Sequence, residues 1–188
     1  MENTQNNDRE KFENDLIGGQ NGERAVAEFL EDHFGWNWIY FNDSKDKQKL
    51  KEFDFYMYDG SHKSVEVKTD RYETFHGETG NMLIEFSCSG KPSGINATKA
   101  DLFIYYYPDH ELAYIIETEK LRKLIKTHHG FAYHIATAGD GLKTKCYFVN
   151  RFASGHHFLT VRVPREYWEK SNQKSMNIVG AEKKSLSL

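Results

Sequence analysis

The sequence predicts a single mixed α/β domain in which helices pack against a β-sheet. Two segments have apolar residues at helical spacing, whereas several short runs rich in aromatic and β-branched residues are typical of strands. No internal repeat and no clear linker divides the 188 residues, a length sufficient to bury one core. With 38% hydrophobic and 14% aromatic residues, the composition excludes a disordered chain.

The first predicted element is a helix over residues 21–35. Asn21 is its expected N-cap and Gly35 its stop signal. Apolar residues recur along it at helical spacing, at Val26, Ala27, Leu30 and Phe34. Glu23 falls on the same stripe, so an acid is expected on the face that packs against the rest of the domain.

A strand at 36–41 and a charged loop at 42–52 lead into a predicted β-hairpin. Its strands are 53–58 and 64–69, in which apolar residues alternate with polar ones. The Asp-Gly turn between them is expected to be centred near Gly60.

The second half of the chain alternates between predicted strands and one predicted helix. Strands are expected at 82–87, 100–107 and 111–117, followed by a helix over 118–128 with Thr118 as its cap. Later strands are expected at 131–137, 145–150 and 157–163.

The domain is expected to occupy residues 16–168. Residues 1–15 are polar and predict a mobile N-terminal tail. Residues 169–188 are polar and weakly patterned, and predict a C-terminal tail.

Composition also restricts the classes of function. A net charge of −3 argues against a protein that coats nucleic acid through bulk electrostatics. No apolar run approaches the ~20 residues of a membrane span, and the polar N-terminus is not a secretory signal. Cys88 and Cys146 form no metal motif or disulfide framework, which favours a cytoplasmic, reducing compartment.

The strand "SVEVKTD" at 64–70 places an acid and a base on one face. Because side chains alternate along a strand, Glu66 and Lys68 share one face and Val65 and Val67 the other. A turn centred near Gly60 puts residues whose numbers total about 120 opposite each other, and hence Asp54 opposite Glu66.

Two opposed carboxylates, with Cβ atoms roughly 4.5–5.5 Å apart, repel each other unless a cation lies between them. Mg²⁺ commonly binds one or two carboxylates and keeps several waters, so Asp54 and Glu66 are candidate ligands and Glu23 a candidate third carboxylate. Lys68 would then lie beside the attacking water or the reacting phosphate. The alternative is a solvated hairpin face with a cross-strand ion pair.

These residues resemble the PD-(D/E)XK nuclease superfamily. Its signature is an Asp, a gap and Glu-x-Lys on a β-hairpin, often with a Glu in the first helix; Phe53 stands here in place of the Pro. The resemblance implies a restriction-endonuclease-like core, with a mixed central sheet flanked by helices and additional C-terminal strands. It also implies Mg²⁺ or Mn²⁺ bound by Asp54, Glu66, the backbone carbonyl of Val67 and Glu23, with Lys68 orienting or activating water.

Two segments are candidate DNA contacts. The loop before Asp54 holds Lys45, Lys47 and Lys49, although a charge run is more often a solvated loop. The loop at 88–101 holds groups that grip phosphate, and an ordinary connection is the alternative there. Its candidate residues are Lys91, Ser93, Asn96, Thr98 and Lys99.

The resemblance therefore implies a metal-dependent endonuclease that hydrolyses DNA phosphodiester bonds. A small phage-type or repair and recombination nuclease is the preferred class, structure-selective or nicking, and a virus-encoded protein acting in its host cell stays open. A homodimer also stays open, because cutting both strands of a junction needs two active sites. The alternative is a non-catalytic nucleic-acid-binding module that retains the nuclease fold.

Overall fold

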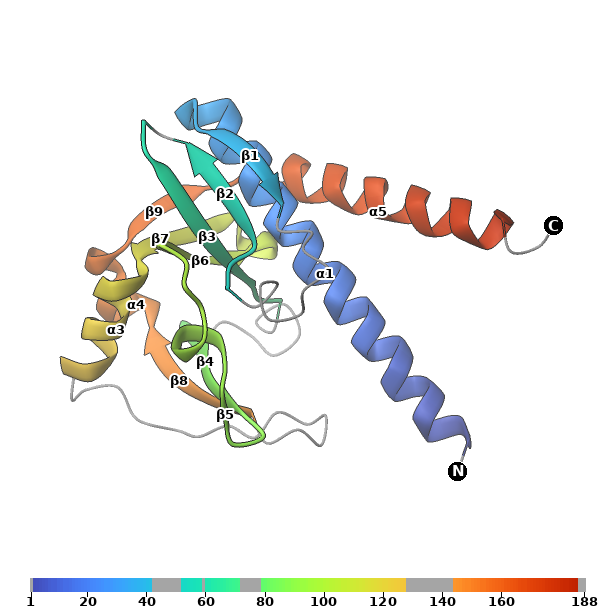
Figure 1. The fold of residues 1–188 in the computed structure, drawn as a ribbon, viewed down its shortest axis with the longest axis horizontal. Helices are drawn as coiled ribbons and strands as arrows, with labels where there is room; N and C mark the ends of the chain where they lie inside the picture. Colours follow the sequence, from blue (N-terminus) through green and yellow to red (C-terminus); the bar gives the residue numbers. More distant parts are fainter. Residues whose placement is uncertain (1, 42–51, 59, 72–78, 128–143, 186–188) are drawn as a thin grey trace.

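The computed structural model describes residues 2–41, 52–58, 60–71, 79–127 and 144–185, and its main feature is a six-stranded mixed sheet (Figure 1). Neighbouring strands are antiparallel except for the parallel pair β3 and β6. In spatial order the strands are β1 (Asn37–Phe41), β2 (Phe55–Tyr58), β3 (His62–Thr69), β6 (Leu102–Tyr107), β7 (Leu112–Glu117) and β9 (Leu159–Arg162).

A smaller antiparallel sheet and four α-helices complete the described fold. The smaller sheet contains, in spatial order, β5 (Lys91–Pro92), β4 (Asn81–Cys88) and β8 (Thr144–Asn150). The helices are α1 (Glu2–Phe34), α3 (Thr118–Thr127), α4 (Arg151–Ser154) and α5 (Arg165–Ser185), and single 3₁₀ turns are η2 (Gly94–Asn96), η3 (Pro108–His110) and η4 (Gly155–His157). The predicted class, a mixed central sheet flanked by helices with additional C-terminal strands, is confirmed.

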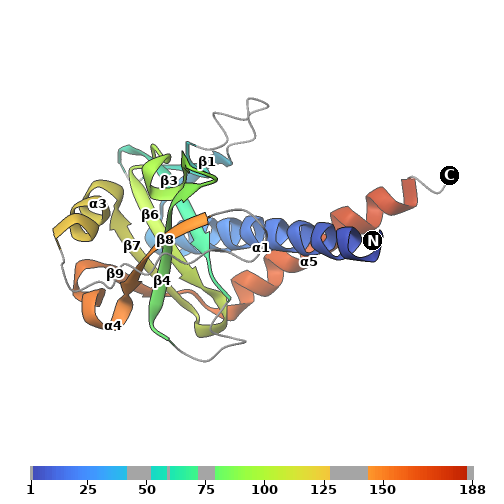
Figure 2. The same ribbon diagram turned by 90° about the horizontal axis from the view of Figure 1, so that it is seen from below.

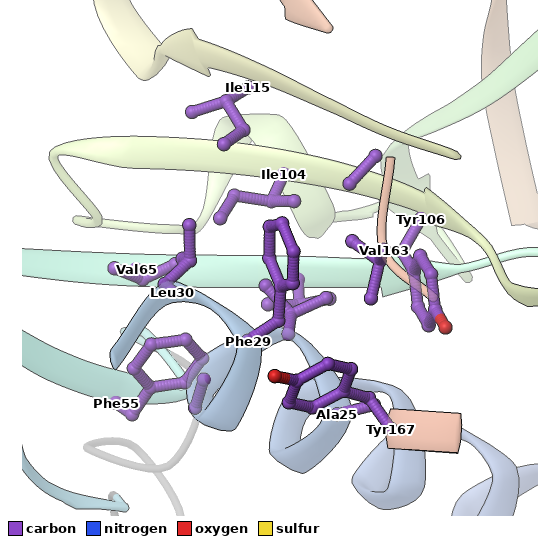
Figure 3. Close-up of a cluster of buried hydrophobic side chains, with 14 of the residues drawn as sticks. Ala25, Phe29, Leu30, Phe55, Val65, Ile104, Tyr106, Ile115, Val163 and Tyr167 are labelled. Carbon is purple, nitrogen blue, oxygen red and sulfur yellow. The ribbon is translucent and has the colours of Figure 1, made fainter. Parts of the chain in front are cut away.

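The large sheet is covered on both faces. One face packs on α1 and α5, where Phe29 and Leu30 meet Val65 and Ile104 (Figure 3). Against the other face lie β4, β8 and α3, which enclose a second apolar cluster. All six residues of β6 are buried, because a central strand between two covered faces has no solvated side.

Helix α1 is longer than the sequence predicts. It begins at Glu2, so that Asn21 is not an N-cap but a buried residue in mid-helix, whose Nδ2 donates a hydrogen bond to Oδ1 of Asn172 at 2.6 Å. The predicted end is confirmed, since Gly35 adopts a left-handed φ of 62°. Tertiary contact with α5 thus overrides a local capping signal.

The C-terminal segment is a helix rather than an irregular tail, up to Ser185. Beyond the buried Tyr167 and Trp168, helix α5 contacts α1 through polar groups: Lys170 and Lys174 both pair with Glu28, at 2.9 and 2.5 Å. A polar contact surface leaves no apolar periodicity in the sequence, which explains why the pattern is weak. Figure 2 shows both α1 and α5 extending beyond the sheets, and Figure 1 shows that their far ends diverge.

The proposed domain limits at residues 15 and 169 do not coincide with element ends, because α1 and α5 run through them. A single nuclease-like domain at 16–168 stays a prediction. Thr118 begins α3 as predicted, but its cap role is wrong: within the described ranges its buried hydroxyl has no hydrogen-bond partner.

Several predictions lie outside the described residues, namely the strand at 131–137 and the loop lysines Lys45, Lys47 and Lys49. In the part of the chain that the structure describes, no helix combines the length and apolarity needed to cross a membrane. Cys88 and Cys146 are both free thiols, in agreement with the sequence.

Candidate active site

The hairpin of β2 and β3 has the register that the sequence predicts. Phe55 pairs with Val65 and Tyr58 with His62, so Asp54 and Glu66 are the residues that adjoin the end of this ladder on the two strands. Gly60, at a left-handed φ of 100°, lies in the turn.

Two hydrogen bonds from the hairpin backbone fix Asp54. Its N–H donates to the carbonyl oxygen of Val65 at 2.8 Å, and its Oδ2 accepts from the N–H of Val67 at 2.6 Å. The carboxylate is therefore attached to the backbone of the Glu66-Val67-Lys68 segment.

Glu66 and Lys68 form an ion pair on the face of β3 that points away from α1. Lys68 Nζ lies 2.5 Å from Glu66 Oε1, and the side chain of Glu66 is only 8% exposed, against 39% for Lys68. The buried Thr98 supports the other oxygen, with Oγ1 at 3.3 Å from Glu66 Oε2. Glu66 is thus held from two sides while Lys68 keeps access to solvent.

A close approach of α1 to β3 brings Glu23 to the same end of the hairpin. A Cβ on Gly22 would lie 1.8 Å from the Thr69 hydroxyl, so the helix can approach this closely only with glycine at that position. Burial raises the pKa of Glu23, the positive charge of Lys68 opposes this effect, and the negative charge of Glu66 adds to it. The carboxyl group therefore lies within electrostatic reach of both residues.

The electrostatics show mutual repulsion among the acids. Burial, followed by the charges of Glu66 and Glu23, raises the pKa of Asp54 well above its ordinary value. Burial alone would lower the pKa of Lys68, but Glu66 and Asp54 outweigh it and raise this pKa. The site thus concentrates more negative charge than one lysine offsets, which is the condition that favours a bound cation.

The donor set fits a site built on two carboxylates rather than three. Among the described residues, no group of three or more His, Cys, Asp or Glu side chains is arranged to hold a metal ion. Asp54 and Glu66 adjoin the end of the same ladder, and Mg²⁺ commonly uses one or two carboxylates and fills its other positions with water. Glu23 lies within electrostatic reach of Lys68 and Glu66.

The predicted DNA-contacting loop divides into two groups. Ser93 donates to Glu85 Oε1 and Thr98 lies against Glu66, so both hydroxyls already have carboxylate partners. Exposed on the surface are Lys91, Asn96 and Lys99, and the last of these pairs with Glu52 at 2.5 Å. The exposed residues agree better with phosphate contact than the two hydroxyls do.

Two acidic residues near the site were not singled out from the sequence. Asp70 accepts a hydrogen bond at 2.6 Å from the hydroxyl of Tyr105, whose pKa is raised by its burial and by Asp70. Glu85 is on β4 and near enough to Lys68 to raise its pKa. The available signal was a single acid within the otherwise apolar run "MLIEF".

Comparison with known proteins gives one distant likeness. No protein-family model matches the chain, and no curated protein matches it. The chain is similar to a solved structure described as a bacterial homing endonuclease, I-Ssp6803I, with 19% sequence identity and a TM-score of 0.38. The match covers 56% of this chain and 69% of that chain. At this level the likeness does not extend to an activity.

Proposed function

We propose that this chain is a divalent-metal-dependent endonuclease that hydrolyses DNA phosphodiester bonds, with Asp54, Glu66 and Lys68 in its active site. The observation that supports this best is the set of contacts at the end of the hairpin, where Asp54 accepts from the Val67 N–H at 2.6 Å and Lys68 lies 2.5 Å from Glu66. An ordinary solvated face would not bury Glu66, or leave Asp54 with a pKa raised by burial and by its acidic neighbours.

Mg²⁺ or Mn²⁺ would be held by the carboxylates of Asp54 and Glu66 and by the backbone carbonyl of Val67. Glu23 would act through water, because it is not part of a closely converging group. When bound, the cation polarises a phosphoryl oxygen and lowers the pKa of water. This ligand set matches the pattern of the PD-(D/E)XK superfamily that residues 22–68 resemble.

Lys68 is the group suited to the reacting centre. It is cationic, because the neighbouring carboxylates raise its pKa, and it keeps 39% of its side chain exposed. Its ammonium would orient the attacking water or offset the charge that develops on the phosphate. Such a role stabilises the transition state more than the bound substrate.

The proposed substrate is a polyanion, whereas the chain itself has a net charge of −3. Contact with DNA must therefore come from a local group of residues. Lys91, Asn96 and Lys99 are exposed, and Lys45, Lys47 and Lys49 precede Asp54 in sequence. We infer a small phage-type or repair nuclease, structure-selective or nicking, that works as a monomer or homodimer.

A cleavage panel tests this proposal. Supercoiled, linear, single-stranded and branched DNA, and RNA, are incubated with the protein and Mg²⁺, Mn²⁺ or EDTA. Cleavage of at least one DNA that needs the cation and is lost in Asp54→Ala supports the proposal. Glu169→Gln, which removes an exposed α5 carboxylate, is the matched control and should cut normally. Binding without any cleavage would instead indicate a non-catalytic nucleic-acid-binding module.

A further inference from the structure

Strand β4 lies above β6 with one backbone edge facing it, and two tyrosine hydroxyls of β6 hold it there. The Tyr107 hydroxyl donates to the carbonyl oxygen of Asn81 at 3.1 Å, and the Tyr105 hydroxyl accepts from the N–H of Leu83 at 2.9 Å. Both contacts are made to the backbone of β4, and the two residues involved on each strand are two positions apart. Two rigid aromatic side chains therefore set the position of β4 along β6.

This position brings Glu85 to the level of the candidate active site. If position 81 lies over 107 and position 83 over 105, then Glu85 lies over Phe103. Phe103 pairs with Glu66 in the parallel β3–β6 register. The backbone contacts alone thus place Glu85 level with Glu66.

The side of β4 on which Glu85 lies also follows from packing. Met82 and Ile84 belong to the apolar cluster formed with β7 and α3. Side chains alternate along a strand, so Leu83 and Glu85 point to the opposite side, toward β3. Consistent with this, the negative charge of Glu85 contributes to the raised pKa of Lys68.

The chain after β4 is built closely around Glu85. The β4–β8 register shifts between Glu85 and Ser87, and such irregularities re-aim side chains next to functional sites. Ser93 donates to the Glu85 carboxylate. A Cβ on Gly94, whose φ is 47°, would lie 2.3 Å from the Glu85 carbonyl oxygen, so the turn can fold over this residue only with glycine there.

We propose that Glu85, held by Ser93, is a positioning residue for Lys68: it is the carboxylate that keeps the ammonium at the site when a cation engages Glu66. Lys68 pairs with Glu66 at 2.5 Å. A divalent cation bound to Glu66 would compete for that charge and repel the ammonium. The Glu85 carboxylate would then be the remaining partner of the Lys68 ammonium. This inference rests on the proposed function.

A double-mutant cycle between Lys68→Ala and Glu85→Gln tests it. In the parent, Glu85→Gln should lower kcat at least about tenfold, because displacing a catalytic group by a small distance is costly. In the Lys68→Ala background the same change should cost less than about twofold. DNA affinity measured with Ca²⁺ should stay within about twofold. Equal losses in both backgrounds would overturn the proposal.

Ser93→Ala and Glu85→Asp keep the test decisive if Glu85→Gln does not fold. Ser93→Ala keeps the charges of Glu85 and Lys68 and removes only the hydrogen bond that Ser93 donates to Glu85. A smaller loss of kcat than for Glu85→Gln is expected in the parent, and no loss in the Lys68→Ala background. Glu85→Asp should regain part of the rate. Mn²⁺ binding without DNA, followed by electron paramagnetic resonance, should change less than about tenfold; a larger loss would make Glu85 a metal ligand instead.

A readout without catalysis separates this inference from the proposed function. In metal-free protein, Glu85→Gln should lower Tm more in the parent than in Lys68→Ala, because only the parent loses an attraction. Equal Tm shifts refute the pairing even if DNA is cleaved. Unequal shifts in a protein that cuts no nucleic acid would retain the pair and refute the nuclease proposal.

Discussion

Replacing Asp54 with either Asn or Ala separates the electrostatic cost of its carboxylate from its hydrogen bond. The raised pKa means that ionised Asp54 destabilises the metal-free fold. Asn removes that charge and keeps an acceptor for the Val67 N–H, which in the parent donates to Asp54 at 2.6 Å. Asp54→Asn should therefore be at least as stable as the parent at pH 7 without metal.

Asp54→Ala removes the charge and the acceptor together. The Val67 N–H is then left without its side-chain partner, at a cost of about 1–3 kcal/mol. For a chain of this size each kcal/mol shifts Tm by roughly 2–4 °C. The Ala variant should therefore unfold roughly 2–12 °C below the Asn variant, measured by thermal denaturation followed by circular dichroism.

The raised pKa of Asp54 also determines how stability should change with pH. A carboxyl whose folded pKa is raised makes the parent lose stability as pH rises from its unfolded pKa, about 3.9, to its folded value. The Asn variant has no such loss from this site. The Tm of Asp54→Asn relative to the parent should thus be smallest in acid and increase with pH through that window. A constant difference across the range would refute this account.

Metal linkage completes the test. Saturating Mg²⁺ at one hundred times Kd should stabilise the parent by about 2.7 kcal/mol, because the cation binds only the folded site. Both Asp54 variants should lose most of this gain together with all cleavage. An Asn variant that gains as much as the parent from Mg²⁺ would exclude Asp54 as a ligand.

Three further predictions follow from the sequence and the structure. Lys68→Ala should lose at least about 10²-fold in cleavage rate while DNA affinity with Ca²⁺ changes much less; equal losses would make Lys68 a simple phosphate contact. Gly22→Ala should destabilise by about 1–3 kcal/mol through overlap with Thr69, whereas Gly19→Ala, which meets nothing within 4 Å, should be neutral or stabilising in urea unfolding. Replacing the loop lysines should flatten the salt dependence of DNA binding in a titration series, and an unchanged slope would contradict contact by Lys45, Lys47 and Lys49.

Local sequence determined the hairpin and the arrangement of its charges. A short turn near Gly60 and strict alternation fix which residues face each other, so the pairing of Phe55 with Val65 could be predicted and Asp54 placed opposite Glu66. The face of α1 that packs on the sheet was equally visible, because Val26 and Leu30 recur at helical spacing. These features depend on residues close in sequence.

Tertiary structure alone decided what surrounds that hairpin. The partner of Asn21 is Asn172, 151 positions away, and the contact turned an expected helix cap into a mid-helix residue. The hydroxyl of Thr98 reached Glu66 in the same way, and the edge-on position of β4 brought Glu85 level with the site. Neither side-chain periodicity nor turn chemistry encodes which distant strand lies over which face, because that choice depends on how whole elements pack.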